Sequence, residues 1–374
     1  MPGFRQPLRL LADDLTGALD SAAAFGTPAA PVMVRWRGEV PGAGPIAQDS
    51  CSRECSAEQA RSAVMAVASA LWAPGAGLAF KKIDSLLRGQ EVAELTAILA
   101  RLRPACCIIA PAFPAQRRMT RAGRQWVWSD GSWQPVPTDL VVGIRQAGHR
   151  VTVMKAGEAA PAGVSFWDAE SDEGLDAVVA AAKGVDDVLW VGSGGLAAAL
   201  ARAAGFDRNE RSEPLPRPIL GLIGSGHAVI REQLGCLGSL HHGLGDHGRG
   251  DGDIASRLSR DGAAFASVEL PQGISRRDAA TAIEARFAAL LSGLDQPGSL
   301  VAAGGETLRS LCDILGAERL DVIGNITPGV PRSIMRGGRW DGLTVVSKSG
   351  AFGGPGLFRH LIAAPAATTT GAAA

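Results

Sequence analysis

The chain has 374 residues, which is enough for two domains with cores of their own. It carries 37 Lys and Arg against 37 Asp and Glu, so no basic surface is expected to attract nucleic acid or an anionic membrane. No apolar run approaches the roughly 20 residues that cross a bilayer, and the first residues lack the apolar core of a signal peptide. The six cysteines fit no zinc-site spacing, which indicates reduced thiols in a cytoplasmic protein.

Apolar, strand-like runs alternate with Ala-rich helical stretches before about residue 205. The predicted strands of this half are Leu8–Ala12, Leu78–Ile83, Cys106–Ala110, Val151–Val153 and Val188–Val191. Alternation of this kind predicts an α/β domain with a mostly parallel sheet and helices on both faces.

A second α/β pattern follows a charged, proline-rich stretch at residues 206–218, which we interpret as a linker. Its predicted strands are Ile219–Ile223, Ala264–Val268, Ser299–Ala302, Arg319–Ile323 and Leu343–Val346. We therefore predict an N-terminal domain over residues 1–210, a C-terminal domain over 216–362 and a disordered Ala/Thr tail over 363–374. His241, His242 and His247 lie in or beside the glycine-rich stretch 243–252, which we expect to be a flexible loop.

Residues 81–89 read Lys-Lys-Ile-Asp-Ser-Leu-Leu-Arg-Gly and follow a predicted strand. They bring together two lysines, Asp84, Ser85 and Arg88. Cations, a carboxylate and a hydroxyl at one strand end suit a small, anionic, hydroxylated substrate. The alternative is a strand end with solvated charges.

A second polar strand end stands near the N-terminus, where Asp13 and Asp14 precede Thr16 and a helix-like segment that contains Asp20. Ligands of open α/β sheets collect at the carboxyl ends of parallel strands, so two such strand ends predict one shared pocket. Helix capping is the structural alternative for one of the two aspartates, but a cap does not require both.

The C-terminal half contains glycine-bearing turns after predicted strands but no P-loop spacing. Gly304 and Gly305 open a helix, where backbone N–H groups can cradle a phosphate. Residues 328–331 read Pro-Gly-Val-Pro, a stiff turn that could form one wall of an adenine slot. Lys348 could place a charge on the phosphates, although lysines at strand ends are more often solvated.

Several motifs together resemble the family of four-carbon acid sugar kinases, which was long known as a domain of unknown function and includes threonate, erythronate and 3-oxo-tetronate kinases. In the N-terminal half the resemblance lies in Asp-Asp-Leu-Thr-Gly-Ala at 13–18, the segment 81–89 and Pro-Ala-Phe-Pro-Ala-Gln at 111–116. In the C-terminal half it lies in segments 304–307, 328–331 and 348–353, which follow in the same order. It spans roughly residues 8–360.

The resemblance implies an ATP-dependent kinase with Mg²⁺, two α/β domains and an active site in the cleft between them. It implies acceptor-side residues in the N-terminal domain, namely Asp13, Thr16, Arg53, Lys82, Ser85 and Arg88. It implies nucleotide-side residues in the C-terminal half, namely Ser225, Gly304, Gly305, Glu306, Pro328, Gly329, Val330, Pro331, Lys348, Ser349, Gly350 and Gly353.

A carboxylate near the acceptor hydroxyl would orient it and accept its proton. Asp13, Asp14 and Asp84 are the candidates for this catalytic role, and we favour Asp14 or Asp84. Arg53, Lys82 and Arg88 are candidates to hold the substrate carboxylate. The metal ligands, the identity of the sugar acid and homo-oligomer formation stay open.

Two segments depart from the family pattern. Arg117 stands where the family usually has glycine, and residues 126–133 place three tryptophans within eight residues. We expect the tryptophan segment to act as a lid, an oligomer contact or a substrate wall. A non-catalytic binding protein or a host-interaction relative is the alternative function, although no charge is missing from the acceptor-side motifs.

Overall fold

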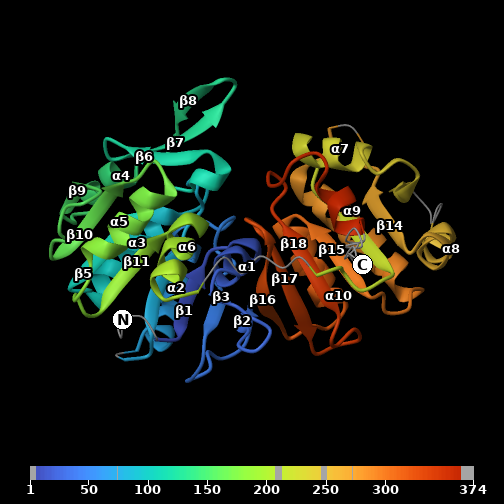
Figure 1. Cartoon of the computed structure of the whole chain (residues 1–374), viewed down its shortest axis with the longest axis horizontal. Helices are drawn as coiled ribbons and strands as arrows, with labels where there is room; N and C mark the ends of the chain where they lie inside the picture. The colour runs from blue at the N-terminus through green and yellow to red at the C-terminus, as the bar shows by residue number, and fades with distance from the viewer. Residues whose placement is uncertain (1–5, 74, 207–212, 246–250, 272, 364–374) are drawn as a thin grey trace, which may run out of the picture. The chain divides into compact units, whose positions relative to one another are not determined.

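The computed structural model describes residues 6–73, 75–206, 213–245, 251–271 and 273–363. The chain forms two compact units (Figure 1). Unit 1 comprises Met1–Glu210 with Glu318–Arg336, and unit 2 comprises Arg211–Ala317 with Gly337–Ala374. The first boundary therefore falls in the stretch that the sequence marks as a linker.

Unit 1 is built on a sheet with the strand order β17-β16-β2-β3-β1-β4-β11-β5-β10-β9. Its strands are β1 (Leu8–Ala12), β2 (Val32–Arg35), β3 (Ile46–Asp49), β4 (Leu78–Lys82), β5 (Cys106–Ala110), β9 (Val151–Lys155), β10 (Gly163–Asp168), β11 (Val188–Gly192), β16 (Arg319–Thr327) and β17 (Val330–Arg336). The strands from β2 to β9 in this order run parallel, and β16 and β17 add an antiparallel hairpin beside β2. β1, β5 and β11 are buried throughout, as expected of parallel strands covered on both faces.

The helices of unit 1 divide between the two faces of this sheet. They are α1 (Leu15–Ala22), α2 (Ala57–Leu71), α3 (Glu91–Leu102), α4 (Leu140–Gln146), α5 (Asp172–Ala181) and α6 (Gly194–Ala203). The crossovers through α2, α3 and α4 all run in one direction along the sheet, and those through α1 and α5 run in the other. Because such crossovers are right-handed, α2, α3 and α4 lie on one face of the sheet and α1 and α5 lie on the opposite face. α6 contacts both α1 and α5.

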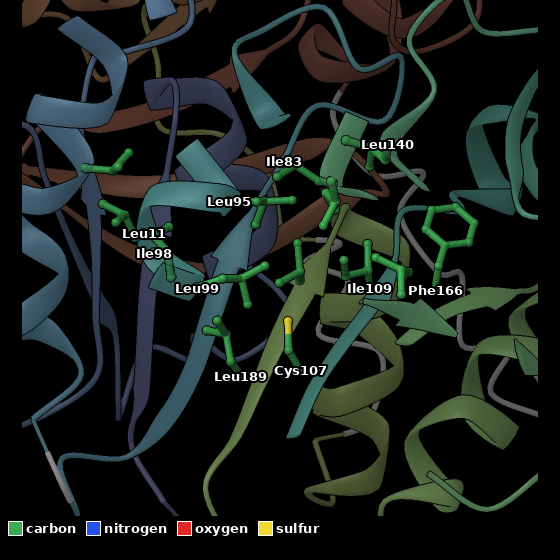
Figure 2. Packing of buried hydrophobic residues seen from close by; sticks show 14 of the residues in the cluster. Leu11, Ile83, Leu95, Ile98, Leu99, Cys107, Ile109, Leu140, Phe166 and Leu189 are labelled. Atoms are coloured by element: carbon green, nitrogen blue, oxygen red, sulfur yellow. The ribbon is translucent and has the colours of Figure 1, made fainter. Parts of the chain in front are cut away.

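The core under α2, α3 and α4 is packed from residues spaced three or four apart on the helices (Figure 2). From α3, Leu95, Ile98 and Leu99 meet strand residues that include Cys107 and Ile109, all less than 5% exposed. Cys107 is thus a core residue, and burial raises the pKa of its thiol. This core fixes the strand ends from which the polar loops of unit 1 emerge.

A separate antiparallel sheet carries the tryptophan segment. It consists of β6 (Arg118–Arg121), β7 (Arg124–Ser129) and β8 (Ser132–Pro135), and the β7–β8 hairpin stands off the large sheet of unit 1 (Figure 1). Asp130 and Gly131 both have positive φ, which suits a two-residue hairpin turn. Trp128 and Trp133 are paired across the hairpin with ring centroids 5.5 Å apart, in an edge-to-face arrangement.

The strands of unit 2 all run parallel to one another, in the order β13-β14-β12-β15-β18. Its strands are β12 (Ile219–Ile223), β13 (His241–Leu244), β14 (Ala263–Val268), β15 (Ser299–Ala303) and β18 (Thr344–Lys348). Its helices are α7 (Ala228–Gly235), α8 (Asp251–Asp261), α9 (Arg276–Ser292), α10 (Gly305–Ile314) and α11 (Leu357–Ile362). Short 3₁₀ turns lie at Pro114–Gln116 in unit 1 and at Gly238–Leu240 in unit 2.

The predicted α/β class with mostly parallel sheets is confirmed, and each predicted strand overlaps an observed one. The extent of the C-terminal domain differs from the prediction, because residues 318–336 cluster with unit 1. The reason is non-local pairing, since Leu320, Asp321 and Val322 of β16 pair with β2. A side chain at Gly26, just after α1, would collide with the carbonyl oxygen of Val322.

The expectation of a flexible loop is wrong for His241 and His242, which lie in β13. The Nε2 atom of His241 is 2.9 Å from the hydroxyl of Ser267. His247 and most of the predicted tail lie outside the described residues.

Candidate functional site

The polar loops of unit 1 gather at the carboxyl edge of three neighbouring strands, β3, β1 and β4. Chain direction reverses here, because β1 leads through α1 towards β2, whereas β3 leads through α2 to β4 on the other side. Such a switch point leaves a crevice in which open α/β sheets bind ligands. The predicted acceptor-side residues lie on these loops or at the ends of the strand and helix beside them.

Arg53, from the loop after β3, joins the two aspartates that follow β1. Its Nε and Nη2 atoms donate to the two carboxylate oxygens of Asp13 at 2.7 and 2.8 Å, and its Nη1 atom is 2.6 Å from Oδ2 of Asp14. Burial alone would raise the pKa of Asp13, but the charge and hydrogen bonds of Arg53, together with Lys81 and Lys82, hold it below its usual value. Asp13 is therefore an ionised carboxylate at 2% exposure.

Asp14 also caps α1, the structural role that the sequence left open for one of the pair. Its Oδ1 accepts the N–H of Gly17 at 2.8 Å, and its Oδ2 accepts the hydroxyl of Thr16 at 2.6 Å. A Cβ atom at Gly17 would lie only 2.5 Å from that Oδ1 and 3.0 Å from Nζ of Lys82. Glycine at this position thus lets Lys82 approach the first turn of the helix.

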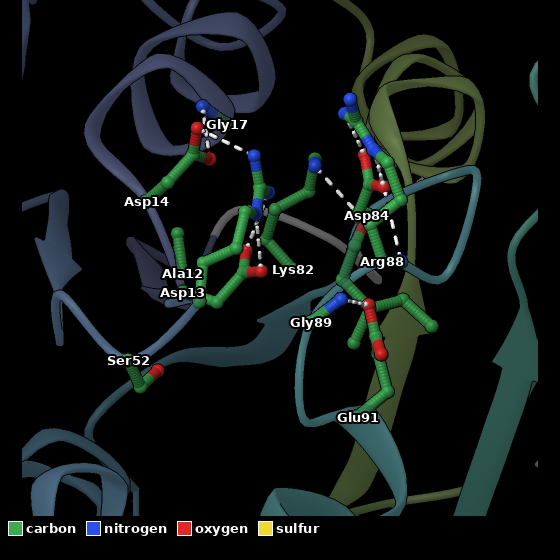
Figure 3. A network of polar contacts seen from close by, with 12 residues as sticks. Ala12, Asp13, Asp14, Gly17, Ser52, Lys82, Asp84, Arg88, Gly89 and Glu91 are labelled. Carbon is green, nitrogen blue, oxygen red and sulfur yellow. Dashed lines mark hydrogen bonds and ion pairs between the residues drawn. The ribbon is translucent and has the colours of Figure 1, made fainter. Parts of the chain in front are cut away.

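Asp84, after β4, forms a bidentate ion pair with Arg88. The Nε and Nη2 atoms of Arg88 donate to its two oxygens at 2.6 and 2.9 Å. Burial raises the pKa of Asp84, but the hydrogen bonds from Arg88 and the charges of Arg53, Arg88 and Lys82 outweigh it and lower the pKa strongly. Figure 3 shows Lys82 between the Asp13–Asp14 pair and Asp84, with its Nζ donating to the carbonyl oxygen of Ile83 at 2.9 Å.

Lys81 makes a fully buried ion pair with Glu94 at 2.7 Å. Glu94 also accepts a hydrogen bond from the hydroxyl of Ser52, next to Arg53 in the chain. The pair ties β4, α3 and the Arg53 loop together, and its 0% and 1% exposure indicates a structural role.

Two site residues that sequence reasoning missed come from the small sheet. Arg118 of β6 donates to the hydroxyl of Ser85, and Gln125 of β7 donates to the carbonyl oxygen of Ser85 at 2.8 Å. Arg117, just before β6, has φ of 53°, in the left-handed region where glycine is ordinary. This backbone conformation agrees with the glycine that the family usually has at this position. The departing segment at Arg117 is next to Arg118 in the chain and could have been the signal for it.

Two further acids of unit 1 have raised pKa values. Burial, with Asp13 nearby, raises the pKa of Glu91 to about 7, and Gly89 donates to Glu91 at 3.0 Å. Burial raises the pKa of Asp20 to about 6, with Asp14 adding to the effect and Lys82 and Arg118 opposing it. Asp20 is thus close to the cluster, although it lies one turn beyond Gly17 on α1.

In unit 2 the glycine-bearing loops also meet at a switch point, since β12 leads to β13 and β14 on one side while β15 lies on the other. Gly304, which follows β15, has φ of 109°, and a Cβ atom there would lie 3.6 Å from Cβ of Ser225 in the loop after β12. A Cβ atom at Gly350, which follows β18, would collide with the hydroxyl oxygen of Ser225. The three predicted nucleotide-side loops therefore touch one another through glycine and serine.

Lys348 ends β18 beneath these loops and is 1% exposed. Its Nζ lies 3.5 Å from the carbonyl oxygen of Gly350 and 5.7 Å from the ring centroid of Phe358. Within the described residues it has no acidic partner, and burial lowers the pKa of Lys348 to about 7. An anion at this place would restore the charge of the amine.

Gln233 of α7 organises the loop that follows Lys348. Its side-chain NH₂ group is within 3.0 to 3.1 Å of the carbonyl oxygens of Phe352, Gly353 and Gly354. Gln233 therefore ties α7 to the loop after β18. Ser349 and Gly350 begin the loop that it holds.

The remaining predicted nucleotide-side residues lie at the tip of the β16–β17 hairpin. Pro328 and Gly329 form its turn, where Gly329 has φ of 81°, and Val330 and Pro331 begin β17. They belong to unit 1. Their assignment to an adenine slot and the placement of the active site between the domains stay predictions.

A magnesium ion can be tested against the residues present. The described part of the chain holds no group of three or more His, Cys, Asp and Glu side chains able to bind a metal. Mg²⁺ with a nucleotide usually needs only one or two carboxylates besides phosphates and water. Among the predicted nucleotide-side residues, Glu306 supplies an exposed carboxylate in the first turn of α10.

Both halves of the chain match known protein families. Residues 8–145 match a family described as a sugar-binding N-terminal domain, and residues 248–358 match one described as a nucleotide-binding C-terminal domain. No helix within the described ranges is both long and apolar enough to span a membrane.

Full-length relatives carry kinase names. The chain is 32% identical to a D-threonate kinase of Cupriavidus necator over 94% of this chain and 96% of the relative. It is 28% identical to a 3-oxo-tetronate kinase of Methylobacterium radiotolerans over 94% and 97%, and 25% identical to a D-erythronate kinase of Heliobacterium modesticaldum over 92% and 93%.

Solved structures share the fold. A crystal structure of a Salmonella typhimurium LT2 protein superposes with a TM-score of 0.71 at 19% identity, covering 94% of this chain and 97% of the other. A Haemophilus influenzae protein superposes with a TM-score of 0.67 at 19% identity, covering 94% and 98%.

Proposed function

Because the chain belongs to the family of four-carbon acid sugar kinases, we propose that it transfers a phosphoryl group from ATP to a hydroxyl of a short sugar acid. The acceptor class is threonate, erythronate or a 3-oxo-tetronate, as the names of the relatives indicate. The observation that carries the proposal is a pair of polar sites, one in each unit, each at the switch point of a parallel sheet.

Unit 1 is the proposed acceptor site. A small hydroxylated acid needs charged groups that are already fixed in place, because phosphoryl transfer depends on positioning and charge neutralisation. The ion pairs of Arg53 with Asp13 and of Arg88 with Asp84 fix these side chains before substrate arrives. Thr16, Lys82 and Ser85 complete the set. Lys82 lies between the Asp13–Asp14 pair and Asp84, and its charge acts on both Asp13 and Asp84.

Unit 2 is the proposed nucleotide site. The start of α10, at Gly304 and Gly305, offers backbone N–H groups to a phosphate, and Lys348 offers a cation that has no acidic partner within the described residues. Mg²⁺, if held by the phosphates and Glu306, would neutralise charge on the transferred group.

A cytoplasmic location is part of this proposal. The six cysteines are present as thiols, which suits a reducing compartment that also supplies ATP.

The test is ADP release, measured with a coupled assay in the presence of Mg-ATP. The panel contains D- and L-threonate, D- and L-erythronate, their 3-oxo forms and branched sugar acids. ADP release with one of these acids, matched by a phosphorylated product in mass spectrometry, would establish the activity and identify the acceptor.

If no acid of the panel causes ADP release, the proposal is contradicted, provided that the same preparation binds ATP by calorimetry. A protein that binds both ATP and an acid without turnover would instead be a non-catalytic relative. A protein that binds neither would overturn both site assignments.

A further inference from the structure

We propose that Asp20 is the general base that accepts the proton of the acceptor hydroxyl. The inference rests on the proposed kinase function and assigns within it a role for which the sequence alone favours Asp14 or Asp84. It is based on a comparison of the hydrogen-bond partners of four carboxylates of unit 1, those of Asp13, Asp14, Asp84 and Asp20.

The carboxylates first considered for this role have oxygens that are already engaged. Both oxygens of Asp84 accept hydrogen bonds from Arg88, and both oxygens of Asp13 accept hydrogen bonds from Arg53. Asp14 accepts from Gly17, Thr16 and Arg53. Guanidinium bonds lower the basicity of a carboxylate, so Asp13 and Asp84 are suited to hold charge and geometry rather than to take up a proton. The oxygens of Asp14 are occupied by its three donors.

Asp20 differs because it makes no hydrogen bond or ion pair with any residue that the structure describes. The residue is partly exposed, and its carboxylate carries no hydrogen bond from a described residue that a ligand would have to displace. Its helix position is three residues after Gly17, which places both on one face of α1, and that face is the one that Lys82 approaches.

A second contact locates the carboxylate. A Cβ atom at Gly194 would lie 2.5 Å from Oδ2 of Asp20, so this oxygen sits against the start of α6. Gly194 follows β11, the strand next to β4 on the side away from β1. Asp20 therefore lies beside the ends of β4 and β11, close to the residues that are proposed to hold the acceptor.

The step balances with the co-substrates already named. The acceptor hydroxyl gives its proton to a carboxylate oxygen of Asp20 while its oxygen forms a bond to the γ-phosphorus of ATP. The bond between that phosphorus and the β,γ-bridging oxygen breaks, and ADP leaves with the electron pair. Asp20 then releases its proton to water, which restores the carboxylate.

The charges that act on Asp20 come from three places: Lys82 of β4, Asp14 at the start of α1 and Arg118 of β6. Burial and Asp14 raise the pKa of Asp20 to about 6, against the effect of the two cations. A base of this strength is ionised at neutral pH and is still basic enough to take up a proton.

The test is Asp20→Asn, which keeps the shape of the side chain and removes the base. We expect kcat to fall by about 100-fold or more, while KM for both substrates stays within about threefold, because general-base catalysis contributes about 10²–10⁴-fold. The wild-type rate should fall below an apparent pKa of about 6, and this acid limb should vanish in the variant.

Two control variants separate a base from a merely structural acid. Asp176→Asn alters a surface ion pair with Arg202 and should leave kcat and the limb unchanged. Glu91→Gln removes the other unit 1 acid with a raised pKa and should keep the limb, whatever it does to the rate. A limb that disappears with Glu91→Gln and survives Asp20→Asn would overturn the assignment.

The assignment can be tested even if Asp20→Asn does not fold. The wild-type profile alone overturns it if kcat stays constant from pH 8 to pH 5. Asp20→Glu retains a carboxylate and should keep measurable turnover with an acid limb. If the wild-type protein phosphorylates no sugar acid at all, the proposed function fails; if it is active and Asp20→Asn is equally active, only the role of Asp20 fails.

Discussion

The two candidate sites lie at equivalent places, each at a switch point between parallel strands, but they differ in how their cations are paired. In unit 1 the guanidiniums of Arg53 and Arg88 are bound by carboxylates of the same unit. In unit 2 Lys348 is a buried amine with no acidic partner within the described residues, below loops made largely of backbone. Unit 1 is thus assembled before its ligand arrives, whereas in unit 2 an anionic ligand would restore the positive charge of Lys348.

This difference predicts how each site responds to the loss of one charge. Removing a charge in unit 1 leaves a fixed partner uncompensated and disturbs the pocket. Removing the amine of Lys348 in unit 2 leaves no partner uncompensated, because the lysine has no acidic partner within the described residues. It should weaken only the binding of the anionic ligand.

Asp84→Asn should have the largest effect outside the proposed base. The neutral side chain can no longer hold Arg88 through two charged hydrogen bonds, so the loop after β4 loses its set geometry. We expect kcat/KM for the sugar acid to fall by about 100- to 1,000-fold. ATP affinity, measured by calorimetry, should stay within about twofold, because the nucleotide residues belong mainly to unit 2.

The pH profile of Asp84→Asn sharpens this test. The acid limb assigned to Asp20 should persist, since the pKa of Asp84 is already strongly lowered and its carboxylate does not titrate near pH 6. Normal turnover in the variant would contradict the assignment of the acceptor site to unit 1. Equal losses of acid and ATP affinity would show that the two sites are not separable.

Lys348→Met should act on the nucleotide alone and is the next largest effect. Charged hydrogen bonds contribute about 1.5–3 kcal/mol, so ATP should bind about 10- to 100-fold more weakly. The affinity for the sugar acid should not change. A variant that binds ATP as tightly as the wild type would place the phosphates elsewhere.

Proton uptake gives an independent measure of Lys348. Burial lowers its pKa from 10.5 to about 7, so the amine is largely neutral at pH 8. Bound phosphates would raise this pKa, and the wild-type protein should therefore take up nearly one proton with ATP at pH 8, measured by calorimetry in buffers of different ionisation enthalpy. Lys348→Met should take up none.

The same shift has a consequence for stability. Between pH 7 and 10.5 the unfolded chain holds the lysine proton that the folded unit has released. The unfolded state then binds more protons, so the free energy of unfolding of unit 2 should rise with pH through this window. The slope should be absent in Lys348→Met, as measured by denaturant unfolding at several pH values.

Much of unit 1 could be predicted because its site is local in sequence. Asp13, Asp14 and Thr16 directly follow β1. Lys82 ends β4, and Asp84, Ser85 and Arg88 directly follow it, so strand adjacency alone brings the two groups together. The contribution of Arg53 also follows from its place after β3, on the other side of β1.

The parts that sequence did not reveal depend on long-range packing. Arg118 and Gln125 reach Ser85 only because the small sheet folds over the loop after β4. Asp20 looks like an ordinary helix residue until α6 is placed beside it. The hairpin 319–336 follows the apparent C-terminal pattern, yet its edge pairs with β2, almost 300 residues earlier in the chain.

The smallest predicted effect concerns two nearby glycines in the loop after β18 of unit 2. It tests whether ATP binding depends on the close approach of this loop to Ser225. At Gly350 a methyl group would collide with the hydroxyl of Ser225 and lie 3.4 Å from Cβ of His227. At Gly354 it would meet nothing within 4 Å, and neither glycine has a positive φ. Gly350→Ala should therefore weaken ATP binding by about tenfold, since overpacking costs about 1–3 kcal/mol, while Gly354→Ala should bind normally.

Ser225→Gly in the Gly350→Ala background decides whether this contact is the cause. Removing the serine side chain removes the obstacle, so the double variant should bind ATP more tightly than Gly350→Ala alone. If both glycine variants bind equally well, the loops after β12 and β18 do not form the phosphate site together. If the double variant is weaker still, Ser225 itself contacts the nucleotide, and the unit 2 site would depend on side chains as well as on backbone.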